Sequence, residues 1–268
     1  MEHGVSWFSF LPGYAQLQTY FMEHHHGQLF NEVVVVQHVL AAALVMIIVL
    51  ALSMMARSDI KSAKDGGVIP DGKFSIRNAF EVIFEALYNQ MQTIIGGKET
   101  RRYFPLVATL ALFIFFCNAI GLIPGFSAPT DNWNTTFACS ILVMLYYNFH
   151  GFRVNGFAYV QHMANPVGEW WGWLLSPLFI VLEGLQFFVV RPFSLAVRLA
   201  ANMTGDHAVL IAFLGLVPIL VPLPFMFLGL FVSFVQTLVF VLLTIVYISL
   251  SVEEHHHDEH HGDAAHDH

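Results

Sequence analysis

The feature that most constrains this chain is the near absence of charge over more than half of its length. A soluble domain carries about 25% charged residues, whereas this chain of 268 residues is 11% charged and 56% hydrophobic. Residues 103–252 contain only seven charged side chains: Asp131, Arg153, Glu169, Glu183, Arg191, Arg198 and Asp206. The sequence therefore predicts an all-α polytopic membrane protein.

Charge and cysteine content exclude several classes of function. The net charge is −8 and no basic patch is present, which excludes a nucleic-acid-binding protein. Cys117 and Cys139 are isolated within apolar runs, so they form neither a disulfide framework nor a metal-binding motif. We therefore expect no metal site and no cofactor.

The apolar runs predict about five transmembrane helices, because a spanning helix needs roughly 20 apolar residues. The sequence after residue 174 must turn, and three prolines between Pro218 and Pro224 favour a break there. The fourth helix is then too long for a perpendicular crossing, so the last two helices are expected to be long and tilted. The transmembrane domain, 33–252, holds the predicted spans 33–56, 104–124, 135–150, 174–216 and 225–252.

Basic residues predict the orientation of these spans. Lysine and arginine concentrate in cytoplasmic loops, and the loop between the first and second spans holds eight of the 11 in the chain. The segment 1–32 is therefore expected outside the cell and the carboxyl terminus inside. The basic residues of the loop are Arg57, Lys61, Lys64, Lys73, Arg77, Lys98, Arg101 and Arg102.

Two further elements are expected on the cytoplasmic side. Apolar residues recur at helical spacing from Phe80 to Ile94, which predicts an amphipathic helix that lies in the membrane surface or packs on the protein itself. The tail 253–268 is rich in His and Asp. Such a composition can bind metal, but its low complexity favours a disordered, solvated end.

The fourth span holds an unusual number of polar groups. A charge at the centre of a bilayer costs at least ~2.5–3.5 kcal/mol and marks a functional residue by default. At 100° per residue, one stripe of this helix carries Arg191, Ser194, Arg198 and Asn202, and His207 lies close to the opposite face. The sequence therefore predicts two separate polar surfaces on one helix.

Arg198 is the charge in this helix that most needs a partner. Arg191 can snorkel to the headgroups, and Glu183 can pair with it. Arg198 has no acidic residue three or four positions away, so its counter-ion is expected from another subunit. An arginine cannot release its proton, which suits a gate between two proton paths. The rival interpretation is a secondary transporter that binds a small anion at Arg198, but no internal repeat supports it.

Polar residues elsewhere are also candidates for a water path. In the fifth span, Ser233 and Gln236 lie on a weak polar stripe, and Gln236 is expected to face the polar stripe of the fourth span. Asn118, in the second span, either lines water or bonds the neighbouring backbone.

Three segments resemble one known family, subunit a of the bacterial F-type ATP synthase. They are Arg-Pro-Phe-Ser-Leu-Ala-Val-Arg-Leu-Ala-Ala-Asn-Met at 191–203, Pro-Thr-Asp-Asn-Trp-Asn-Thr-Thr at 129–136, and the last helix from Gln236 to Tyr247. The resemblance implies a non-catalytic, proton-conducting stator subunit of the bacterial inner membrane. Its partners would be subunit b, protons and the ring of c subunits.

The resemblance also implies roles for individual residues. Arg198 would face the carboxylates of the c-ring, with Asn202 and Gln236 beside it, and His207 would lie in a half-channel open to the outside. Gly229 stands where the family commonly has an ionisable partner for that position, so His207 would act alone, through water or with Asp206. Other candidate channel-lining residues are Glu183, Arg191, Ser194, Asn118 and Ser233.

Overall fold

A computed structural model describes residues 7–24, 36–62, 75–123, 125–164, 172–216 and 222–253, which contain helices and no strand. The predicted all-α fold is confirmed for these residues, whereas the expectations about the tail fall beyond them, apart from Glu253 at the end of the last helix. The helices are η1 (Trp7–Phe10), α1 (Tyr14–His24), α2 (Gln37–Ser62), α3 (Ile76–Ile95), α4 (Gly97–Ile120), η2 (Pro129–Asp131), α5 (Trp133–Ala164), α6 (Gly172–Leu185), η3 (Gln186–Val190), α7 (Arg191–Leu216) and α8 (Pro222–Glu253).

Four stretches of helix in the described part of the chain are long and apolar enough to cross a membrane. They correspond to the first, second, fourth and fifth predicted spans: Gln37–Lys61, Glu99–Ile120, Ser176–Phe213 and Leu223–Ser251. This number differs from the five spans that we predicted.

The third predicted span, 135–150, lies inside α5, which is longer than expected and continues to Ala164. Gly156 interrupts it with a φ of 54°, a conformation that glycine adopts readily. Polar residues such as Asn148 and His150 lower the hydropathy of α5, but both are buried. The protein itself therefore covers the polar groups that a lipid-facing helix could not carry.

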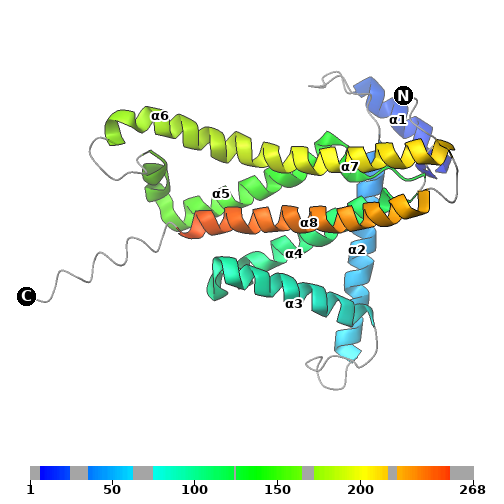
Figure 1. Cartoon of the computed structure of the whole chain (residues 1–268), viewed down its shortest axis with the longest axis horizontal. Helices are drawn as coiled ribbons and strands as arrows, with labels where there is room; N and C mark the ends of the chain where they lie inside the picture. The colour runs from blue at the N-terminus through cyan, green and yellow to red at the C-terminus, as the bar shows by residue number, and fades with distance from the viewer. Residues whose placement is uncertain are drawn as a thin grey trace, which may run out of the picture.

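The long fourth helix is nearly continuous from residue 172 to 216, where α6, η3 and α7 follow one another. At 1.5 Å per residue its length is about 67 Å, far more than the roughly 30 Å of a bilayer core. Figure 1 shows α7 and α8 side by side, with α2 at a steep angle to both. The three helices therefore cannot all stand along the membrane normal, as expected for two long, tilted helices.

A single turn of π-helix, η3, joins α6 to α7. π-turns leave backbone groups outside the regular bonding ladder, and here the Tyr147 hydroxyl of α5 donates to the Phe187 carbonyl at 2.8 Å. This buried hydrogen bond ties the joint of the long helix to α5.

The main core lies where α4, α5, α7 and α8 meet. Its buried residues come from all four helices and also from α3 and η3. This packing fixes α7 against α8, and therefore positions the polar residues of α7. Representative core residues are Val107, Ile114, Val143, Leu199 and Ile245.

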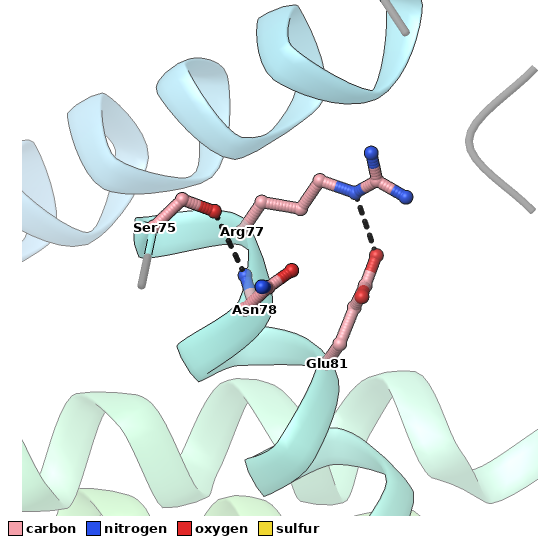
Figure 2. Close-up of polar contacts among 4 residues, drawn as sticks. All are labelled: Ser75, Arg77, Asn78 and Glu81. Carbon is pink, nitrogen blue, oxygen red and sulfur yellow. Dashed lines mark hydrogen bonds and ion pairs between the residues drawn. The ribbon is translucent and has the colours of Figure 1, made fainter. Parts of the chain in front are cut away.

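The amphipathic helix α3 begins with a side-chain cap. The Ser75 hydroxyl accepts a hydrogen bond from the backbone N–H of Asn78 at 3.3 Å, as is typical of an N-cap. In the first turn of the helix, Arg77 Nε donates to Glu81 Oε1 at 2.7 Å, as Figure 2 shows. Arg77 is fully buried, so this ion pair offsets the cost of burying its charge.

The apolar face of α3 packs on the protein itself. Met91 is fully buried in the main core, and the rings of Phe84 and Tyr88 meet Phe104 of α4 edge to face, with centroids 5.9 and 5.4 Å apart. Gly96, with a φ of 90°, then turns the chain into α4. The structure thus shows that α3 packs on the protein, which does not exclude that the same helix also lies in the membrane surface.

The corner after α4 requires a residue without a side chain. A Cβ atom at Gly121 would lie 2.9 Å from Met203 Cε and 3.1 Å from the backbone Cα of Ala128, although the backbone of Gly121 is in the ordinary helical region. The small size of Gly121, and not its conformational freedom, therefore lets Ala128 and Met203 pack against the end of α4.

We predict that Gly121→Ala destabilises the protein by about 1–3 kcal/mol, the usual cost of overpacking. The matched control is Gly184→Ala in α6, where a Cβ meets nothing within 4 Å. Equilibrium unfolding in detergent micelles measures both variants. Equal stability of Gly121→Ala and the wild type would contradict the tight corner.

Candidate functional site

The polar residues of α7 form two faces, as the helical arithmetic predicts. Arg198 and Asn202 are exposed on the first face, which borders α8. His207 is partly buried on the second face, beside η2. The two polar faces of α7 therefore contact different elements, α8 and η2.

Arg198 carries a permanent positive charge on an apolar, exposed surface. No ion pair joins it to any residue that the structure describes, although the ion pairs of Arg77 and His207 are present. Ala201, Gly205 and Val209 continue the same exposed face along the helix. A charge in such surroundings requires a counter-ion when the surface is covered by an apolar phase.

Asn202 and Gln236 connect α7 to α8. The Asn202 amide nitrogen donates to Gln236 Oε1 at 2.5 Å, which is the contact that we expected between the polar stripes of the last two spans. The Gln236 amide nitrogen and the Ser233 hydroxyl are buried without a hydrogen-bond partner among the described residues. Buried polar atoms of this kind bind water or a partner group in most proteins.

Arg191 lies at the joint of the long helix among aromatic rings. Its guanidinium carbon is 3.9 Å from the centre of the Phe187 ring and 5.2 Å from that of Tyr247. Cation–π contacts of this kind stabilise a charge away from water. Ser194 and Glu183 are half-buried on either side of this joint.

Asn118 has a structural partner. Its side-chain oxygen accepts a hydrogen bond from the Thr130 hydroxyl at 2.6 Å, and both residues are buried. Asn118 therefore holds η2 against α4. The partner of Asn118 in this bond is a side chain and not the neighbouring backbone that we expected.

Sequence reasoning missed the residue that lies beside His207. Asp131 Oδ2 is 3.4 Å from His207 Nδ1, and Asp131 Oδ1 accepts a hydrogen bond from the Thr204 hydroxyl at 2.6 Å. A signal was present, because Asp131 is one of the seven charges in the apolar part of the chain. Asp131 is far from His207 in sequence, so helical periodicity could not pair them.

Asp131 is held in its ionised form by these contacts. Burial raises the pKa of its carboxyl group, but the hydrogen bonds from His207 and Thr204 outweigh burial, and the pKa lies below its usual value. One carboxylate and one imidazole do not make a metal site, and the described residues contain no group of three or more metal-binding side chains.

Gly229 does not leave an open space near the site. A Cβ atom there would lie 2.5 Å from Leu122 Cδ2, so this leucine occupies the position of a side chain. Asp206, the acidic neighbour of His207 that we considered, forms no ion pair with it among the described residues, whereas Asp131 does. The acid beside His207 therefore comes from η2.

Comparison with known proteins identifies the family of the chain. The ATP synthase A chain family matches residues 39–249. ATP synthase subunit a of Sorangium cellulosum is 40% identical over 80% of this chain and 81% of the relative. The subunits a of Bdellovibrio bacteriovorus and Geobacter sulfurreducens are 40% and 42% identical, over 82% and 80% of this chain and 93% and 86% of their own lengths. The chain therefore belongs to the ATP synthase A chain family and is a bacterial-type subunit a.

Proposed function

We propose that this chain is the proton-conducting stator subunit of the Fo sector and has no catalytic activity of its own. It would provide two aqueous half-channels that couple proton flow to rotation of the c-ring. The observation that carries the proposal is Arg198, a permanent charge on the exposed face of α7 with no ion pair to the described part of the chain. In the proposed topology, α1 is outside the bacterial inner membrane and the end of α8 is cytoplasmic.

The proposed role of Arg198 follows from its chemistry. A guanidinium stays protonated throughout the physiological pH range, so it attracts an ionised carboxylate of the ring without carrying a proton itself. A carboxylate that reaches Arg198 must lose its proton first, because only the ionised form pairs strongly with arginine. Arg198 therefore separates the path by which protons arrive from the path by which they leave.

The surface around Arg198 suits a rotating apolar partner. Large apolar side chains are exposed along α6, η3 and α7. Arg198 is exposed among them, whereas Glu183 and Arg191 are half-buried. Exposed apolar surface on this scale marks contact with lipid or protein. The exposed residues include Leu178, Val181, Leu182, Leu185, Phe188, Val189, Phe193, Val209 and Ile211.

The remaining polar groups divide between the two proposed half-channels. His207, with Asp131, lies nine residues beyond Arg198, about 14 Å along the helix axis, and we assign it to the outer path. Glu183, Arg191 and Ser194 lie on the other side of Arg198 in sequence, and we assign them to the inner path. Subunit b is the proposed stator partner, and it contacts the chain away from the ring.

The Arg198→Ala variant tests the proposal. We expect it to abolish proton-driven ATP synthesis and leave assembly of the complex intact, because the ring carboxylate loses its counter-charge. The control is Arg101→Ala, which removes an exposed arginine at the start of α4. Purified complexes in liposomes, energised by a pH step, measure both variants.

Normal synthesis by Arg198→Ala complexes would refute this role. A second arm uses the purified chain alone in liposomes. If Arg198 instead served a transporter for a small anion, the chain alone would move that anion, and the alanine variant would not. We expect no transport without the ring.

A double-mutant cycle tests the link between α7 and α8. We expect Asn202→Leu and Gln236→Leu each to destabilise the protein, and the double variant to cost less than their sum by about 0.5–1.5 kcal/mol, the net strength of one hydrogen bond. Unfolding in detergent measures the three variants. Strict additivity would show that the two amides do not interact.

A further inference from the structure

We propose that Asp131 is the positioning residue of the outer proton path, where its carboxylate orients His207 and compensates the charge that His207 gains with each proton. The inference rests on the proposed function, since it assigns a partner to the histidine of the same path. The observation behind it is a cluster of three side chains, Asp131, Thr204 and His207, contributed by η2 and α7.

The two oxygens of the Asp131 carboxylate have different partners. Oδ1 accepts from the Thr204 hydroxyl at 2.6 Å, and Oδ2 lies 3.4 Å from His207 Nδ1. Thr204 and His207 are three residues apart and lie on one face of α7. The Thr204 hydroxyl therefore holds the Asp131 carboxylate in the orientation in which Oδ2 faces the His207 imidazole.

The three residues before Asp131 are buried and hold its backbone in place. Ala128, Pro129 and Thr130 are buried, and the Thr130 hydroxyl bonds to Asn118. The Asp131 N–H donates to the Ala128 carbonyl at 3.1 Å. A carboxylate on such a fixed support can orient its partner, whereas one on a free loop cannot.

The cluster is partly accessible at the surface of the subunit. The Asp131 side chain is 30% exposed and that of His207 is 20% exposed. Partial exposure permits exchange of protons with water, and partial burial strengthens the charge interaction between the two groups. Asp206, the acidic residue next to His207 in the sequence, forms no ion pair with it among the described residues.

The proton balance of the proposed step is simple. The Nδ1–H group of neutral His207 donates a hydrogen bond to the Asp131 carboxylate, which leaves Nε2 free to accept a proton. A proton from the outer water binds Nε2 and forms an imidazolium next to the carboxylate. Release of the same proton to water nearer the ring restores the neutral imidazole, and Asp131 stays ionised throughout. The role of Asp131 thus resembles that of an acid that orients and stabilises a histidine in general acid–base chemistry.

The test uses the whole complex in liposomes and measures ATP-driven proton pumping. We expect Asp131→Asn, which keeps the shape and loses the charge, to reduce pumping about tenfold, the effect of losing one charge-assisted hydrogen bond. Asp131→Glu should recover part of the rate. The matched control, Asp59→Asn, removes an exposed carboxylate of α2 and should pump normally.

A merely structural role for Asp131 predicts a different result in a second background. If Asp131 acts through His207, then Asp131→Asn should have no further effect in a His207→Ala complex. Additive losses would overturn the proposal, and so would undiminished pumping by Asp131→Asn. A loss with Asp206→Asn in place of Asp131→Asn would also overturn it.

If Asp131→Asn complexes do not assemble, Thr204→Val carries the test, because it releases Oδ1 of Asp131 and should slow pumping several-fold. An unchanged rate in Thr204→Val complexes would then overturn the proposal.

The Arg198→Ala variant separates failure of the proposed role of Asp131 from failure of the proposed function. Loss of coupling in Arg198→Ala with normal pumping in Asp131→Asn would refute the role of Asp131 alone. Normal coupling in Arg198→Ala would refute the proposed function itself.

Discussion

An arginine charge in an apolar environment is the constraint on which the rest of this structure depends. A guanidinium at membrane depth is costly unless a carboxylate compensates it, and no residue that the structure describes forms an ion pair with Arg198. The helix that carries it is supported on one side by α8, through Asn202 and Gln236, and on the other by α5 and the main core. This support leaves the exposed face of α7 available for a partner that brings the missing charge.

The same helix separates two kinds of chemistry. Arg198 cannot exchange its proton, whereas His207 can, and the helical period places them on different faces of α7. η2, a short turn between α4 and α5, brings Asp131 to the second face. A proton path and a charge gate can therefore share one helix without direct contact between the two residues.

The helices could be predicted from periodicity and hydropathy, because both patterns depend on residues that are close together in the sequence. The boundaries of α8 and of the long helix through α6 and α7 fell within a few residues of the expected ones, since apolar length and proline are read directly from the sequence. α5 was harder, because the predicted span 135–150 lies inside a helix that continues to Ala164, and hydropathy does not mark a helix that continues beyond its apolar run. The Asn202–Gln236 contact was predicted from two polar stripes, whereas Asp131 was missed because only the folded chain brings η2 to α7.

The most direct test of the central claim is to locate the ring against α7 by cysteine cross-linking in the assembled complex. With Cys117 and Cys139 replaced by serine, a cysteine at the exposed Ala201 should form a disulfide with a cysteine placed beside the ring carboxylate. A cysteine at Leu199, which is fully buried, should not. Cross-links from position 199 and none from position 201 would show that the ring faces another side of the helix, and would contradict the account.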